Sequence, residues 1–365
     1  MECGFCWVEK VEKIMTEEKN KSIVLYVVED TKSAQFRYRV KNIAETLKKS
    51  SKWEARWALK SDLDDVDLSG IGLVVILRQT GRDRAVLNFI KKAQLKGLKV
   101  LFDLDDLIFD YRDLLTLMKG TGSKNVAYWM GYMWGIRRIA KRVNGFIATN
   151  NFLAEKLERS FFKSCSVIPN SLNSEQIEIA DESLNNKKHK GFVIGYFSGS
   201  PTHTKDLRLV ESEIFKFLDE HKDARFEIVG YVEPSLEMQK RINKGRVKIF
   251  KLVNYLEQIK MMAKVDVNIA PLVVNDFTNC KSELKFFEAG VAETVTIASP
   301  SYSFGKAISD SRNGFLAQPG EWYDKLEYIY KNPANSQDIA KKAREYALKH
   351  YYGKEFLKLV EEAYG

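Results

Sequence analysis

The sequence has 365 residues, enough for two domains of ordinary size, and its 45% hydrophobic and 29% charged residues are typical of a globular protein. The formal net charge of +9 predicts an anionic partner: nucleoside diphosphates, an anionic membrane surface or nucleic acid. Nucleic acid is the weakest candidate, because the sequence has no zinc-finger spacing, arginine-rich tail or aromatic RNA-binding motif, and we expect no such partner.

Residues 1–21 form a charged lead without the apolar segment of a signal peptide, and no apolar run approaches the ~20 residues of a membrane-spanning helix. Cys3 and Cys6 have the spacing of a redox or metal pair, but no second pair or nearby His completes a zinc site, so we expect no metal. Together with Cys165 and Cys280, this cysteine usage is typical of a reducing compartment. We therefore expect a cytoplasmic protein, either soluble or attached peripherally to the inner face of the membrane.

From residue 22 to residue 180, apolar runs alternate with amphipathic stretches, which predicts a first α/β domain with a parallel sheet. The predicted strands are Ser22–Val28, Trp53–Ala58, Ile71–Leu77, Lys99–Phe102, Gly145–Thr149 and Cys165–Ile168. The predicted helices are Gln35–Lys49, Asp83–Lys96, Val126–Val143 and a helix that Asn150 caps and that ends at Glu158.

Charged side chains follow two of these strands at the edge where ligands collect in open α/β sheets. Arg37 and Arg39 lie near the end of the first strand and are candidates to pair with a phosphate or an acidic sugar of an acceptor, unless they belong to a solvated helix face. Asp103, Asp105 and Asp106 follow the fourth strand. A carboxylate there could accept a proton from an acceptor hydroxyl or orient it, and the alternative is a turn or capping role.

The helix 126–143 combines a core stripe with unusual aromatic weight and a basic outer face. The stripe is Tyr128, Tyr132, Ile136, Ile139 and Val143, and the basic residues are Arg137, Arg138, Lys141 and Arg142. The pattern favours a buried amphipathic helix, and the alternative is an interfacial helix for a lipid-linked acceptor or an anionic membrane. The preceding stretch 111–125 contains glycines and reads as a loop over the acceptor site.

The polar segment 174–190 is the expected linker, and a second α/β domain is predicted over residues 191–340. Its first strand, Phe192–Phe197, leads into a loop of small residues with Gly199 and Ser200, followed by His203 and Lys205. Such a loop between a strand and a helix is a phosphate-binding arrangement. Lys205 is a candidate to neutralise a diphosphate, and the plainer interpretation of His203 is an ordinary surface residue.

The rest of the second domain follows the same alternation, and helices in residues 341–365 end the chain. The predicted elements are the helix 207–219, strands 225–229 and 247–249, helix 255–262, strand 265–270, polar loop 275–279, a helix from about 281, strand 295–298, a turn and strand in 310–316, and helices 322–331, 338–351 and 354–363. The helix near residue 281 has Ser282 as a plausible cap, Lys281 and Lys285 beside its positive end, and Glu288 one turn further on. A phosphate and the vicinal hydroxyls of a ribose would suit that helix, although solvated lysines are the plainer interpretation.

The stretch Lys281-Ser282-x-x-Lys285-x-x-Glu288-Ala289 resembles the donor-binding helix of the retaining, nucleotide-sugar-dependent glycosyltransferases of family 4, glycosyl transferases group 1. In that family the helix carries two glutamates, and this sequence has Cys280 at the first position. It is closer to a variant subgroup with the Lys-Ser-x-x-Lys-x-x-Glu-Ala arrangement, which often also carries Arg-Tyr-Arg where this sequence has 37–39. Lys205 matches the family's loop lysine, and no arginine precedes it in the loop.

This resemblance implies a GT-B fold, with two doubly wound Rossmann-like domains facing a cleft and a C-terminal helix that crosses back to the first domain. It implies transfer of a hexosyl or deoxyhexosyl group from a nucleoside-diphosphate sugar to a hydroxyl acceptor, with retention of configuration and without a metal or other cofactor. The donor site would comprise Gly199, Ser200, His203, Lys205, Lys281, Ser282, Lys285 and Glu288, with Lys205 and Lys285 stabilising the leaving diphosphate and Asp105 or Asp106 acting on the acceptor.

The acceptor would be a glycan or a lipid-linked intermediate of surface polysaccharide or glycoconjugate synthesis, bound near Arg37, Arg39 and Asp103. Two alternatives remain open at the level of sequence. One is a nucleotide-sugar epimerase on the same fold, and the other is a non-catalytic partner subunit of a glycosyltransferase.

Overall fold

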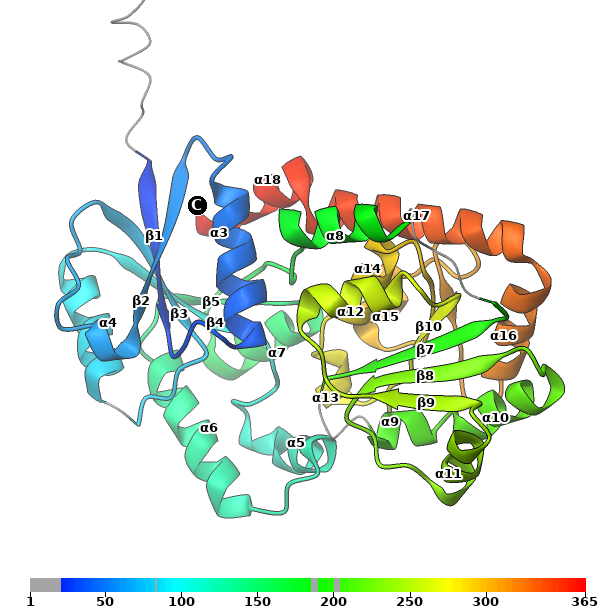
Figure 1. Cartoon of the computed structure of the whole chain (residues 1–365). Helices are drawn as coiled ribbons and strands as arrows, with labels where there is room; N and C mark the ends of the chain where they lie inside the picture. Colours follow the sequence, from blue (N-terminus) through cyan, green and yellow to red (C-terminus); the bar gives the residue numbers. More distant parts are fainter. Residues whose placement is uncertain (1–20, 83, 185–189, 200–203) are drawn as a thin grey trace, which may run out of the picture.

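The computed structural model describes residues 21–82, 84–184, 190–199 and 204–365, which form two α/β domains side by side (Figure 1). Cys3, Cys6, Ser200 and His203 lie outside these described residues. Each domain contains a six-stranded sheet in which all neighbouring strands are parallel.

The first sheet has the strand order β2-β1-β3-β4-β5-β6. Its strands are β1 (Ser22–Val28), β2 (Trp53–Leu59), β3 (Ile71–Leu77), β4 (Lys99–Leu104), β5 (Gly145–Ala148) and β6 (Cys165–Val167). Helices are α2 (Ala34–Phe36), a π-helical turn η1 (Arg37–Lys41), α3 (Asn42–Leu47), α4 (Arg84–Leu95), α5 (Leu114–Thr121), α6 (Val126–Ala140) and α7 (Asn151–Phe161), with short 3₁₀ turns η2 (Lys60–Asp62) and η3 (Tyr111–Asp113). The central strands are continuous apolar runs because helices cover both faces of the sheet.

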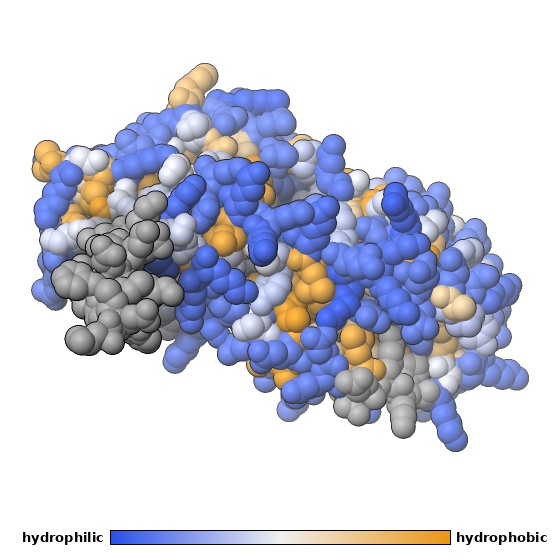
Figure 2. Space-filling model, turned by 90° about the horizontal axis from the view of Figure 1, so that it is seen from above, coloured by the Kyte–Doolittle hydropathy of each residue, from blue (hydrophilic) through white to orange (hydrophobic). Residues whose placement is uncertain are grey.

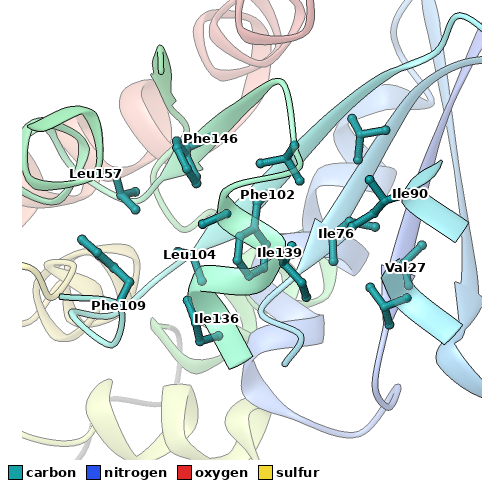
Figure 3. Packing of buried hydrophobic residues seen from close by; sticks show 14 of the residues in the cluster. Val27, Ile76, Ile90, Phe102, Leu104, Phe109, Ile136, Ile139, Phe146 and Leu157 are labelled. Carbon is teal, nitrogen blue, oxygen red and sulfur yellow. The ribbon is translucent and has the colours of Figure 1, made fainter. Parts of the chain in front are cut away.

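The inner faces of α4 and α6 pack on one side of this sheet. In Figure 3, Ile90 of α4 and Ile136 and Ile139 of α6 surround the strand residues Ile76 and Phe102. All five side chains are fully buried or nearly so, and this packing uses the apolar stripe of each helix.

The second sheet has the order β12-β11-β10-β7-β8-β9, in which the direction of strand progression reverses between β7 and β10. Its strands are β7 (Val193–Ser198), β8 (Arg225–Gly230), β9 (Val247–Phe250), β10 (Val267–Ala270), β11 (Val295–Ala298) and β12 (Phe315–Leu316). The helices are α8 (Ser174–Leu184), α9 (Thr204–Arg208), α10 (Glu211–Glu220), α11 (Leu236–Asn243), α12 (Tyr255–Met262), α13 (Asp276–Asn279), α14 (Leu284–Val291), α15 (Tyr302–Ala307) and α16 (Trp322–Lys331). A ligand site is expected at the reversal, outside the carboxyl ends of the strands.

The last two helices, α17 (Pro333–Tyr351) and α18 (Gly353–Tyr364), lead from the second domain back to the first (Figure 1). Phe356, Val360 and Tyr364 of α18 are buried in the core that β1 and β3 share with α3. The Tyr364 ring also meets the ring of Trp53 edge-on, with centroids 5.7 Å apart. The predicted GT-B fold, including the returning C-terminal helix, is therefore confirmed.

Several local predictions were wrong. The stretch 111–125 is not a loop, because η3 and α5 occupy most of it and Gly122 ends α5 in the left-handed conformation, with φ of 70°. The expected helix 207–219 is two helices, α9 and α10, and α11 and α15 were missed. The segment 174–190, expected to link the domains, begins with α8, which packs with the second domain through Ala180.

Candidate active site

A cleft of about 440 Å³ lies between the domains, within the range of small-molecule sites. It is lined by residues that follow the carboxyl ends of strands in both sheets. From the first domain these include Ala34, Arg37, Tyr38, Asp105, Asp106 and Thr149, and from the second domain Phe197, Gly199, Leu272, Lys281, Ser282, Lys285 and Glu288. The structure thus brings together the four residues predicted on the donor helix and places them opposite both aspartates of the first domain.

Lys285 presents a buried amine that has no hydrogen-bond partner among the described residues. The amine lies at the first turn of α14, where the helix dipole and unpaired backbone N–H groups also favour an anion. Its nearest aromatic neighbour is the ring of Tyr196, with the centroid 4.7 Å from Nζ. Burial lowers the pKa of Lys285 to about 8, and the Asp206 carboxylate only partly offsets this effect. A phosphate group in the cleft would supply the missing negative charge.

Glu288 lies one turn further along α14 and is 1% exposed. Its carboxylate accepts hydrogen bonds from the Tyr38 hydroxyl, from Gln258 Nε2 at 3.1 Å and from Gln176 Nε2 at 3.4 Å. Burial raises the pKa of Glu288 to about 7, although the hydrogen bond from Tyr38 opposes the rise. All three partners are neutral donors, which sugar hydroxyls can replace without leaving a charge unpaired.

Lys281 joins the two halves of the cleft through Asp106, whose Oδ1 lies 3.5 Å from Lys281 Nζ. Arg78 donates through Nη1 to Asp106 Oδ2 at 2.8 Å and to Asp105 Oδ1 at 3.0 Å. Burial raises the pKa of Asp106, but Lys281 and Arg78 outweigh burial and hold it below its ordinary value. A carboxylate of low pKa is a poor proton acceptor, so this arrangement favours orienting an acceptor over deprotonating it.

Ser282 also lies at the domain boundary, but it does not cap the donor helix as expected. The helix begins later, at Leu284, and its N-cap residue is Glu283. The Ser282 hydroxyl instead accepts a hydrogen bond from Asn170 Nδ2 at 2.9 Å. Asn150 holds the neighbouring segment in place by donating to the Lys281 carbonyl at 3.1 Å.

Cys280, which stands at the family's first glutamate position, faces away from the cleft. Its side chain is fully buried in the core of the first domain together with Phe277. Burial raises the pKa of its thiol well above the usual value. Gly120 on α5 provides room for this contact, since a Cβ at that position would lie 2.4 Å from Phe277 Cδ1.

Arg39 and Asp103 do not line the cleft, contrary to the predicted acceptor role. Both are buried, and Arg39 donates to the Asp103 carboxylate through Nε at 3.1 Å and Nη2 at 2.9 Å. A third donor of Arg39, Nη1, reaches the Ile168 carbonyl at 2.5 Å. Because every contact joins elements of the first domain, the pair fixes the strand ends beneath the cleft and leaves no group for an acceptor. Arg37 does line the cleft, and its guanidinium lies 3.9 Å from the ring centroid of Tyr255.

Lys205 is exposed and is not among the described residues that line the cleft. It lies near the start of α9, where its amine approaches the Lys119 carbonyl of α5 at 3.5 Å. The structure therefore does not bring Lys205 together with Lys285. Gly199 does line the cleft, and a Cβ there would meet no atom within 4 Å.

Several residues in or beside the cleft escaped the sequence analysis because their role depends on a distant partner. Tyr38 contacts Glu288 across 250 residues of sequence, and Arg78 reaches two aspartates that the sequence had singled out without it. Tyr255 and Gln258, at the start of α12, complete the second-domain wall. A strand-end position was the only available signal for Arg78, which follows Leu77 at the end of β3.

Among the residues that the structure describes, no group of three or more His, Cys, Asp or Glu side chains is arranged to hold a metal ion. Within the same residues, none of the helices combines the length and apolar character needed to cross a bilayer.

Two Rossmann-like domains that face each other across a cleft, with a returning C-terminal helix, define the GT-B class of proteins. Residues 191–332, which span most of the second domain, match the family described as Glycosyl transferases group 1. The similarity to this family thus lies within the second domain of a GT-B fold. A comparison with curated protein sequences gave no significant match.

Solved structures of three GT-B proteins superpose on nearly the whole chain. HepE of Anabaena in complex with UDP gives a TM-score of 0.63 at 12% identity, covering 94% of this chain and 98% of the other. Sucrose-phosphate synthase of Thermosynechococcus elongatus gives 0.66 at 12% identity with the same coverage. A glycosyltransferase of Rickettsia africae gives 0.64 at 14% identity, again covering 94% and 98%. At these identities the likeness establishes the fold.

Proposed function

We propose that the protein is a retaining glycosyltransferase that moves a hexosyl or deoxyhexosyl group from a nucleoside-diphosphate sugar to a hydroxyl acceptor, without a metal. The observation that carries the proposal is the buried, unpartnered amine of Lys285 at the start of α14, with the Glu288 carboxylate on the same helix and the same cleft wall. An anion recognised at a helix start beside a carboxylate that accepts hydroxyl donors is the pattern of a nucleotide phosphate and its ribose.

In this proposal Lys285 and the first amides of α14 stabilise the charge that builds on the leaving diphosphate. Glu288 holds the ribose hydroxyls, and Lys281 contributes positive charge at the mouth of the cleft. The acceptor lies against the first domain, where Asp105 and Asp106, fixed by Arg78, orient its hydroxyl. The catalytic and binding roles predicted for Lys205, Arg39 and Asp103 are not part of this proposal, because those side chains are directed elsewhere.

The solved structures, rather than the cleft, guide the choice of base and sugar to test. Structures of HepE contain UDP and UDP-glucose, which makes uridine nucleotides the first donors to test. The acceptor that we propose is a glycan or lipid-linked intermediate in the synthesis of a surface polysaccharide or glycoconjugate.

A thermal-shift panel of uridine, guanosine and thymidine diphosphate sugars tests donor binding. A nucleotide at 100 times its dissociation constant should stabilise the wild type by about 2.7 kcal/mol. Lys285→Met should lose most of this protection, whereas the control Lys260→Met, which removes an exposed lysine of α12, should keep it. Equal protection of both variants, or of neither the wild type nor the variants, would contradict the donor site.

The stereochemistry needs a separate measurement. Nuclear magnetic resonance of the product formed with a hydroxyl acceptor should show the same anomeric configuration as the donor. Conversion of the donor to an epimer without an acceptor would favour the epimerase alternative, and donor binding without any turnover would favour a non-catalytic subunit.

A further inference from the structure

Positive charge is concentrated on one part of the first domain. The sequence has no Asp or Glu between Asp113 and Glu155, a stretch that includes α5, α6 and six basic residues, and none between Arg84 and Phe102, which include α4. The six basic residues are Lys119, Lys124, Arg137, Arg138, Lys141 and Arg142. All 49 acidic residues lie outside these two stretches, so the net charge of +9 is not spread evenly.

Helix α6 also exposes apolar and aromatic side chains. Its inner face packs on the sheet through residues such as Ile136 and Ile139 (Figure 3). On its outer side Val126, Tyr128 and Trp134 are each about half exposed, at 51%, 49% and 51%. The sequence-based expectation that Tyr128 belongs to the core stripe was therefore wrong. Leu115 on the neighbouring helix α5 is 70% exposed. Large apolar side chains exposed on two helices that contact each other are typical of an interaction surface.

A basic groove of about 470 Å³ adjoins this apolar cluster, between α4 and α6. Arg84, Lys91, Arg138 and Arg142 line it, and none of the four forms a salt bridge with a carboxylate among the described residues. The guanidinium of Arg138 lies 4.7 Å from the ring centroid of Trp134, so the cationic and aromatic parts are continuous. We call the groove and the exposed residues of α6 and α5 together the α4–α6 face.

We propose that the α4–α6 face docks on an anionic lipid bilayer. Exposed aromatic and aliphatic side chains would enter the headgroup boundary, while the unpaired cations of the groove would contact lipid phosphates. A bilayer suits this face better than a purely ionic partner, because large apolar side chains such as Trp134 and Leu115 are exposed beside the cations. Seen from above, the molecule has a largely hydrophilic surface with separate hydrophobic patches (Figure 2).

The α4–α6 face is connected to the acceptor side of the cleft through α6 itself. Tyr128 stacks on Tyr132 with ring centroids 6.0 Å apart, and the Tyr132 hydroxyl lies 3.4 Å from Nε of Arg78, which holds Asp105 and Asp106. Docking would therefore bring the acceptor wall of the cleft to the membrane surface. That use, delivery of a lipid-linked acceptor, rests on the proposed function, whereas docking itself does not.

Vesicle flotation of the full chain tests the docking. The protein should float with phosphatidylcholine vesicles that contain phosphatidylglycerol and not with phosphatidylcholine alone, and added salt should weaken binding. Each cation near an anionic surface strengthens binding about fivefold. The triple variant Arg84→Gln, Arg138→Gln, Arg142→Gln should therefore bind about 100-fold more weakly. Trp134→Ala should bind several-fold more weakly, both with and without added salt.

The matched control is Lys306→Gln, Arg312→Gln, Lys349→Gln, which removes the same charge from a groove on the second domain. It should bind vesicles nearly as the wild type does. Equal losses in the two triple variants, binding that ignores phosphatidylglycerol, or a change of oligomeric state in place of vesicle binding would each overturn the proposal. Thermal protection by UDP should be unchanged in the α4–α6 variant. If no nucleotide of the panel protects either protein, the proposed function fails while the docking result stands.

Discussion

The two domains that face the cleft treat buried charge in opposite ways. In the first domain, Arg39 and Asp103 neutralise each other, and Arg78 binds both Asp105 and Asp106. In the second domain, the amine of Lys285 has no hydrogen-bond partner among the described residues. These carboxylates of the first domain are thus paired with cations before any ligand binds, whereas the Lys285 amine is available to an anion.

The pKa values express the same difference. Burial raises the pKa of Asp103 to about 6, and Arg39 limits that rise, so the pair is ionised at neutral pH. Burial brings Glu288 to about 7 and Lys285 to about 8, where neither ionised form is strongly favoured. Buried groups with displaced pKa values are typical of binding and catalytic sites. We infer that the second-domain wall gives up folding stability to recognise an anionic ligand.

The largest expected effect is on the free energy of unfolding and tests whether the buried Arg39–Asp103 pair stabilises the first domain. Arg39→Ala should lower the free energy of unfolding by about 3–5 kcal/mol, because it leaves the Asp103 carboxylate buried without its partner. Urea denaturation followed by circular dichroism measures this loss. The double variant Arg39→Met, Asp103→Leu should recover much of it, since both charges are then absent. A loss below about 1 kcal/mol in the single variant would show that the pair does not hold the wall together.

The next effect is an increase in the free energy of unfolding and concerns Glu288 in the second domain. A carboxyl whose pKa rises from 4.5 unfolded to about 7 folded stabilises the folded state at low pH, and this contribution disappears as the pH rises through 7. Glu288→Gln removes the cost of the buried ionised carboxylate. It should therefore increase the free energy of unfolding by up to about 3 kcal/mol above pH 7 and by little below pH 4.5.

Urea denaturation at pH 5 and pH 8 measures the pH-dependent gain from Glu288→Gln. Nucleotide protection should fall in the same variant, because a neutral amide replaces the acceptor of the ribose hydroxyls. Glu257→Gln, at an exposed position of α12, is the control and should change neither quantity. A Glu288 variant that is less stable at pH 8 would mean that the carboxylate is a structural group.

A smaller effect concerns the pH dependence of donor binding. Since the free protein holds the Lys285 amine with a pKa of about 8 and a bound phosphate favours the ammonium form, nucleotide binding should take up a proton above pH 8. The affinity for UDP should then fall about tenfold per pH unit, or about 1.4 kcal/mol. Isothermal titration calorimetry in buffers of different ionisation enthalpy measures the proton uptake. Lys285→Met should show none, and the same uptake in that variant would assign the proton to another group.

The smallest expected effect is on UDP affinity and concerns the hydrogen bond from Tyr38 of the first domain to Glu288 of the second. The Tyr38 hydroxyl donates to Glu288 in the free protein and competes with the ribose hydroxyls that we place there. Tyr38→Phe should therefore strengthen UDP binding about fivefold, the value of roughly one hydrogen bond of 1 kcal/mol. Calorimetric titration at pH 7.5 measures this change. Weaker binding in the variant would indicate that Tyr38 contacts the nucleotide itself.

The sequence predicted much of the fold because its strands are buried on both faces. β1, β3 and β11 have the predicted bounds, as do α12 and α16. Short, continuous apolar runs between turn residues are typical of strands in a sheet that helices cover on both faces. The misassigned loop near α5 shows the limit of composition, since Gly120 lies within that helix to admit the Phe277 ring rather than to break the chain.

The grouping of residues on α14 was predictable and the buried ion pair of the first domain was not, for a physical reason. Lys281, Ser282, Lys285 and Glu288 lie within one local segment, so spacing alone places them together. Arg39 resembled a surface residue in the sequence, but its partner Asp103 is 64 residues away and burial of both depends on the tertiary fold. Lys205 was predicted to lie in the site and does not line the cleft. Its place between a loop and a helix does not fix the direction of a long side chain.

The measurement that tests the central claim most directly is a crystal structure of the protein with UDP. The account predicts a phosphate oxygen within about 3 Å of Lys285 Nζ and ribose hydroxyls that donate to the Glu288 carboxylate. A diphosphate bound outside the cleft, or a nucleotide in the cleft that leaves the Lys285 amine without a contact, would contradict it.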